Sequence, residues 1–88
     1  MLTTIPNLTI IVNDWNGGTT CTKTGLTGVT EDNNIIINPA PSSYTTFVES
    51  VVRATAQGNG SITFTCDSTP SSPITLTILI LNKGGISV

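Results

Sequence analysis

Ionisable side chains are the first candidates for chemistry in this sequence, and it has few of them. The 88 residues include three lysines and arginines, five aspartates and glutamates, and no histidine. Without histidine, no side chain has an ordinary pKa suited to general-base catalysis at neutral pH. No serine lies in a motif with a partner base, and no glycine-rich phosphate-binding loop is present. The sequence therefore predicts a protein that is not an enzyme and has no cofactor.

One acidic cluster, Glu31-Asp32-Asn33-Asn34, contains the side chains that calcium prefers. It lacks the spacing of a dedicated calcium loop, so a solvated turn is the favoured interpretation. The two cysteines, with no histidine in the chain, do not complete a zinc site. We predict no metal site.

Cys21 and Cys66 allow either two thiols or one disulfide. Cys66 continues the apolar face of Ile62 and Phe64, where a thiol acts as a small hydrophobic group. The start of the chain shows no signal-peptide pattern, which favours reduced thiols. A disulfide remains the alternative, and would add about 2–4 kcal/mol of stability.

Trp15 is the only tryptophan, and it precedes the turn signal Asn16-Gly17-Gly18. A ring of this kind is an anchor in a core or an interface, or a platform on which a sugar stacks. We therefore treat Trp15 as a candidate interface residue and as a candidate ligand surface.

The low charge limits the partners. Charged residues make up 9% of the chain, against about 25% in typical domains, and the net charge is −2. Three scattered cations do not form a track for phosphates, so nucleic acid is not an expected partner. The longest apolar run, Ile74 to Leu81, is far shorter than the roughly 20 residues that cross a bilayer, and a membrane is not expected either.

Periodicity predicts an α+β fold. Apolar residues recur at three- and four-residue spacing from Tyr44 to Thr55, which predicts one amphipathic helix over about 43–57. Ser43, or a capping box from Thr46 to Glu49, would begin it, and Gly58 would end it. Five other segments favour strands: 8–12, 19–26, 35–37, 61–66 and 74–81. We expect a small, mostly antiparallel sheet or sandwich of about five strands with this helix, as a single domain over 1–88 with a core at 7–82 and a loose tail at 83–88.

The last predicted strand carries more apolar surface than one sheet face needs. Thr75 and Thr77 alternate with apolar neighbours, but Leu79 and Leu81 make the far end apolar on both faces. A domain this small has little interior to cover both sides, so a second copy of the chain is expected to do so. The predicted homo-oligomer interface contains Leu79, Leu81, Ile11 and Trp15.

The order of motifs resembles a small module of tailed-phage virion proteins of Gram-positive hosts, found in head-fibre, tail and baseplate proteins. The resemblance spans residues 15 to 81. In chain order it rests on Trp15, Cys21-Thr22-Lys23-Thr24, Gly28-Val29-Thr30-Glu31-Asp32, an amphipathic helix ending in Arg53-Ala54, the run from Gly60 to Phe64, and Pro70 with Pro73 before the apolar final strand. Cys21 stands where an aromatic residue is common, and the helix is shorter and more β-branched than in the family.

The resemblance implies a non-enzymatic structural protein of the virion, assembled in the host cytoplasm. It implies a homotrimer that decorates a capsid or joins fibre and tail parts, with other virion proteins as partners and host cell-surface polysaccharide as a ligand of some members. No residue here matches a sugar site of the family. The alternative is a secreted bacterial adhesin domain, held by a Cys21–Cys66 disulfide and binding glycans through Trp15.

Overall fold

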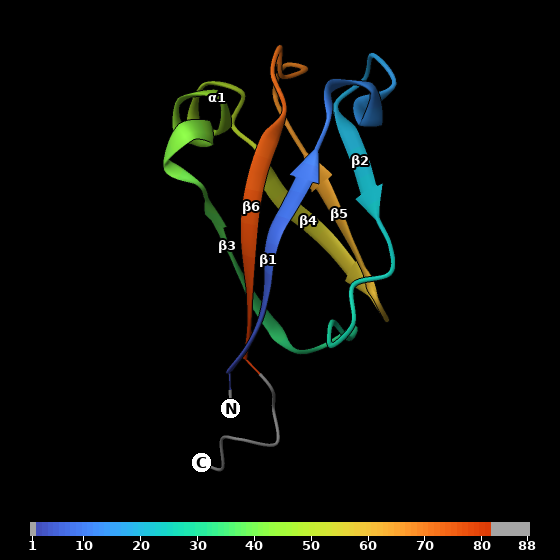
Figure 1. Ribbon diagram of the computed structural model, residues 1–88. Helices are drawn as coiled ribbons and strands as arrows, with labels where there is room; N and C mark the ends of the chain where they lie inside the picture. Colours follow the sequence, from blue (N-terminus) through green and yellow to red (C-terminus); the bar gives the residue numbers. More distant parts are fainter. Residues whose placement is uncertain (1, 82–88) are drawn as a thin grey trace.

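The computed structural model describes residues 2–81, which form two three-stranded antiparallel sheets packed face to face (Figure 1). Sheet A has the strand order β1-β6-β3 and sheet B the order β2-β5-β4. The elements are β1 (Leu2–Ile10), the 3-10 helix η1 (Val12–Trp15), β2 (Thr20–Lys23), β3 (Asn34–Pro39), the 3-10 helix η2 (Pro41–Ser43), α1 (Tyr44–Glu49), β4 (Arg53–Gly58), β5 (Ser61–Thr65) and β6 (Ile74–Leu81).

Strand β6 is the centre of sheet A, and its alternating sequence sets the two faces of that sheet. Ile74, Leu76, Ile78 and Ile80 point inward and are all 0% exposed. The residues between them point outward and are half-buried. Since side chains alternate along a strand, the eight residues of β6 give one face to the core and one to the outside.

Sheet B supplies the other half of the core. Ile62 and Phe64 of β5 are 0% exposed and pack toward sheet A, together with the buried Cys21 of β2. The opposite face of sheet B carries threonines. Thr22 and Thr63 share a hydrogen bond of 3.0 Å, and Thr55 and Thr65 share one of 2.7 Å. This outer face is therefore polar, and these four hydroxyl groups are paired with one another.

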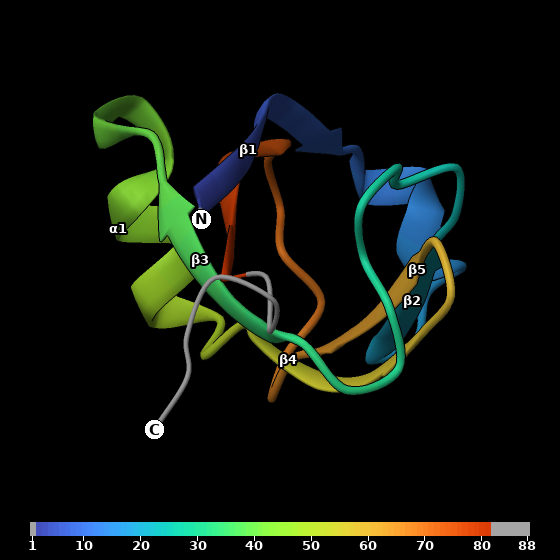
Figure 2. The ribbon, with the colours of Figure 1, turned by 90° about the horizontal axis from the view of Figure 1, so that it is seen from below.

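The two open sides of the sandwich are closed by different means. On one side η2 and α1 lead from β3 to β4, and α1 lies beside the sandwich in both views (Figures 1 and 2). Phe47 of α1 packs against the core. The Ser43 hydroxyl accepts a hydrogen bond of 2.9 Å from the backbone amide of Thr75, which fixes the start of the helix to β6. On the other side η1 connects β1 to β2.

The structure confirms the predicted fold class, a small, mostly antiparallel β-sandwich with one helix, and has six strands where about five were predicted. The first strand begins and ends earlier than predicted: β1 spans Leu2–Ile10, and Val12 lies in η1. The domain core accordingly starts before residue 7. The predicted tail at 83–88 lies outside the described residues.

The predicted helix over 43–57 is wrong beyond its first half. The helix ends at Glu49, and residues Arg53–Gly58 form β4. Val51 has a positive φ of 54°, which breaks the helix, and Asn59-Gly60 turns β4 back onto β5. Gly58 therefore ends a strand, and Arg53 pairs with Asp67 at 2.9 Å. Ser43 is the N-cap residue of α1, but its side chain does not cap the helix.

Candidate functional site

Apolar side chains gather on the outer face of sheet A at the end where β6 finishes, which is the lower half of this face in Figure 1. Leu79 and Leu81 of β6 point outward there, and Ile36 of β3 lies opposite Leu79 and is 50% exposed. We call these three residues the sheet-A patch. The upper half of the same face is polar, because Thr75, Thr77 and Asn38 occupy it.

Charge is absent from the whole of sheet A. None of the residues in β1, β3 and β6 is acidic or basic. Among the described residues the charged side chains lie in η1, α1, sheet B and the loops. Monomeric domains commonly keep charged groups on exposed faces for solubility, so this charge-free face with half-buried leucines is the candidate site.

The structure separates the predicted interface residues. Leu79 and Leu81 lie at one end of β6, whereas Ile11 follows the pair Ile10–Ile74 at the other end. Five residues of a strand span about 17 Å, so Ile11, although 47% exposed, is not part of the sheet-A patch.

Trp15 does not fit either predicted role. Its side chain is 1% exposed and belongs to the core cluster. An indole at this depth offers no ring face to a sugar or to another chain, so the interpretation of Trp15 as an interface or ligand residue is corrected to that of a core anchor. Its Nε1 has no hydrogen-bond partner among the described residues, and leaving such a donor unpaired costs free energy.

Ile36 is the patch residue that sequence reasoning missed. The run Ile35-Ile36-Ile37 predicted a short strand, and the structure places β3 at the edge of sheet A with only Ile35 and Ile37 packed against the core. The flanking Asn34 and Asn38 were the available signal. They continue the face of Ile36 at two-residue spacing, and both are exposed.

Both cysteines are buried free thiols on the inner face of sheet B. Cys21 lies opposite Phe64, and the Cys66 amide donates to the Thr19 carbonyl at 2.9 Å, so the cysteines are diagonal neighbours. Diagonal positions lie about 7–8 Å apart, which is beyond the usual Cα separation of a disulfide, about 4.4–6.8 Å. Burial raises the pKa of both thiols and keeps them protonated.

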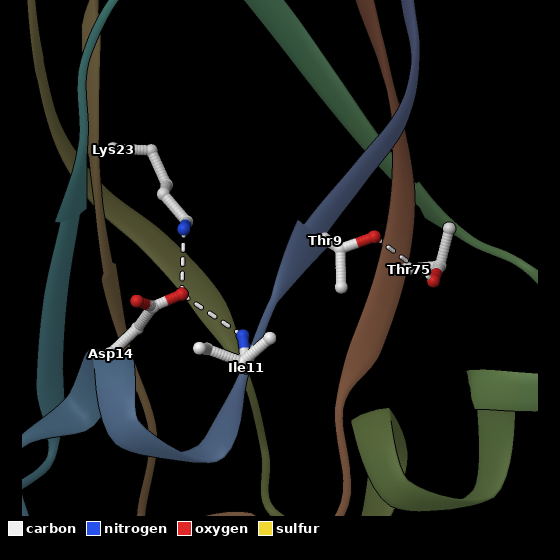
Figure 3. A network of polar contacts seen from close by, with 5 residues as sticks. All are labelled: Thr9, Ile11, Asp14, Lys23 and Thr75. Atoms are coloured by element: carbon white, nitrogen blue, oxygen red, sulfur yellow. Dashed lines mark hydrogen bonds and ion pairs between the residues drawn. The ribbon is translucent and has the colours of Figure 1, made fainter.

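The ion pair of Lys23 and Asp14 connects two elements of the fold (Figure 3). The Lys23 ammonium of β2 donates to Asp14 Oδ2 at 2.6 Å, and the same oxygen accepts the Ile11 amide at 2.9 Å. These two hydrogen bonds lower the pKa of Asp14 below its ordinary value. One carboxylate thereby joins the end of β1 to β2 across the side of the sandwich.

The Glu31–Asn34 turn is held by amide hydrogen bonds. The buried Asn33 donates to the Gly28 carbonyl at 2.8 Å, and Gln57 donates to the Thr30 and Asn33 carbonyls at 2.7 and 2.8 Å. These bonds attach the turn to β4.

Over residues 2–81, no three cysteine or acidic side chains gather as metal ligands, and no pocket is present. No helix in that range has the length and apolar character to cross a membrane. In comparisons with known proteins, no family model, curated protein or solved structure matches this chain.

Proposed function

We propose that this chain is a non-enzymatic structural protein of a phage particle, of the head-fibre, capsid-decoration or tail-fibre type, that works by self-association. One observation supports this most: sheet A is free of charge and keeps Leu79, Leu81 and Ile36 outside the core. Fully burying an exposed side chain of this size contributes about 1.5–3 kcal/mol; these three are already partly buried, so each contributes a fraction of that value, and their sum still matters in association. The resemblance to virion modules favours a trimer, with other virion proteins and host-surface polysaccharide as further partners.

The adhesin alternative has lost its two supports. It required an exposed Trp15 to bind glycans, and this side chain is 1% exposed. It also required a Cys21–Cys66 disulfide, and both residues are free thiols in diagonal positions.

Self-association is tested by light scattering after size exclusion, over a hundredfold range of protein concentration. We expect an oligomer that Leu79→Asp dissociates, because the new carboxylate would be buried without a partner. Thr77→Asp is the matched control, since Thr77 lies on the same face of β6 but in its polar half, opposite Asn38. A wild-type chain that stays monomeric throughout would remove the main support for the proposal.

The assignment to a virion has its own test. Peptide mass spectrometry of purified particles from the phage that encodes the chain should detect it at many copies per particle. Particles that are complete but lack the chain would refute this part of the proposal, even if the isolated protein associates.

A further inference from the structure

Among residues 2–81, the free edge of β3 is guarded against pairing with another strand only at its last residue, Pro39. Proteins commonly guard exposed edges with charge, proline or a bulge. In β1 a register shift at Pro6-Asn7 interrupts the ladder. Lys23 lies on β2, and β4 has both Arg53 and a register shift. Residues Asn34 to Asn38 of β3 have neither a charge nor an irregularity.

Alternate residues of β3 turn their backbone N–H and C=O groups toward β6 or toward the free edge, and this hydrogen-bond phase decides which groups the edge offers. The Ala40 amide donates to the Thr75 carbonyl of β6 at 2.9 Å. Since the direction of these groups alternates along an antiparallel ladder, Asn38, Ile36 and Asn34 also turn their N–H and C=O toward β6. Ile35 and Ile37 turn theirs to the free edge. Pro39 has the same outward phase, where its missing N–H removes no bond to β6.

The sequence of this edge is its own reverse: Asn34-Ile35-Ile36-Ile37-Asn38. Two antiparallel copies centred on Ile36 therefore place isoleucine beside isoleucine and asparagine beside asparagine. In that register Ile35 of one copy faces Ile37 of the other, and these are the residues whose backbone groups point outward. Donors and acceptors then match in both directions. The palindrome and the hydrogen-bond phase select the same register independently.

We propose that β3 pairs with β3 of a second copy, antiparallel about a two-fold axis at Ile36, joining two copies of sheet A into one continuous sheet. The pairing rests on the proposed self-association and specifies its geometry. Four backbone hydrogen bonds form, between Ile35 and Ile37 of opposite copies. On the outer face the Ile36 side chains meet, and each already adjoins Leu79 of its own β6. The sheet-A patches of the two copies thus become one apolar strip, flanked by pairs of asparagine amides.

α1 lies at the upper end of β3 and on the side of β3 away from β6 (Figures 1 and 2), and most of the strand runs below it. A two-fold contact uses the same surface of both copies, so the pairing leaves no β3 edge free to bind a third copy. It therefore produces a dimer, in contrast to the trimer that the resemblance favours.

A cysteine at the symmetry centre tests the pairing directly. In Ile36→Cys the two introduced thiols would face each other at a position without backbone hydrogen bonds, where Cβ atoms of opposed residues come closest, about 4.5–5.5 Å. We expect oxidation with diamide to convert most of the protein to a disulfide-linked dimer on non-reducing gels. Thr4→Cys is the control, because Thr4 is exposed in the same row of sheet A but on the opposite edge. The native Cys21 and Cys66 are 5% and 2% exposed, so the wild type sets the background.

Light scattering of charged variants supplies the second measurement. Ile36→Lys should raise the dissociation constant of the dimer at least a hundredfold, whereas Thr4→Lys should change it less than threefold. Dissociation by both variants, or a dimer whose introduced thiols at position 36 do not cross-link, overturns the edge pairing. A wild-type trimer overturns the pairing but leaves the proposed self-association standing. A wild-type monomer overturns both.

Discussion

The Ser43 hydroxyl is a small group on which the closure of the sandwich depends. Ser43 is 6% exposed, and its Oγ accepts the backbone amide of Thr75 at 2.9 Å. Ser43→Ala removes this acceptor and leaves the amide at the start of β6 unpaired. The substitution should not weaken α1 itself, because the Ser43 side chain makes no capping bond to the helix.

The size of the effect follows from the position of the freed amide. A buried donor left without a partner costs about 1–3 kcal/mol. Thr75 is half-buried, so water can partly replace the hydroxyl, and we expect a loss of about 1–2 kcal/mol. For a domain of this size each kcal/mol corresponds to about 4–8 °C, so Tm should fall by roughly 5–15 °C.

Urea unfolding followed by the fluorescence of the buried Trp15 measures this loss, and amide exchange at Thr75 locates it. The control is Ser42→Ala, an exposed neighbour in η2, which should change stability by less than about 0.5 kcal/mol. Equal stabilities for the two variants, or unchanged exchange at Thr75, would show that the hydroxyl does not hold β6. A fall in helix content with unchanged Thr75 exchange would instead restore the capping role predicted from the sequence.

Three further outcomes are expected from the structure. In urea unfolding, Val51→Gly should be more stable than Val48→Gly by about 1.5–3 kcal/mol, although the two valines are similarly exposed, at 45% and 49%. Glycine at position 51 removes the strain of a left-handed backbone, about 1–2 kcal/mol, whereas glycine at position 48 destabilises the helix by about 0.5–1 kcal/mol. Because its ion pair lowers the pKa of Asp14 below 3.8, stability from this group is complete above that pH and lost as the pH falls through the folded-state pKa. Asp14→Asn should flatten this acid limb of the urea-unfolding profile, and an unchanged limb would assign it to other carboxylates. Cys21 and Cys66, whose pKa values burial raises, should react with a thiol reagent at pH 8 only slowly until the protein unfolds, when two thiols appear; rapid reaction of the folded protein would contradict their burial.

The strands of this fold were predictable where their alternation was strong. The prediction of 74–81 matches β6, and that of 61–66 matches β5 to within one residue. The start of β1 was missed because threonines and Pro6 occupy positions where an apolar pattern was sought. That segment is a strand because β6 supplies its partner, and its register with β6 shifts between Ile5 and Leu8.

The error at residues 50–57 has a local cause. Phe47, Val48, Val51 and Val52 follow helical spacing, and the weak alternation of Arg53–Gly58 does not oppose it, since alanine fits either structure. The decisive signal was Asn59-Gly60, a favoured hairpin turn. It requires a strand on both of its sides, and the prediction placed one only after it.

The candidate site was half predictable. The apolar excess of Leu79 and Leu81 was visible in the sequence. Both are an odd number of residues from Leu76 and Ile80, so they lie on the face of the strand opposite to those two residues. The exposure of Ile36 and the burial of Trp15 depend on which strands stand at the edges of the sheets. Edge positions follow from tertiary pairing, which the order of segments along the chain does not specify.

The place of β6 in the chain also determines when sheet A can exist. Its two outer strands, β1 and β3, are not paired with each other, and within the sheet each is hydrogen-bonded only to β6, which follows both along the chain. During synthesis from the N-terminus, all three strands of sheet B leave the ribosome before Ile74 does. At that point β1 and β3 have been synthesised, but β6, the strand with which both pair, has not. The uncharged half of the molecule is thus the last to become shielded from the other newly made chains around it.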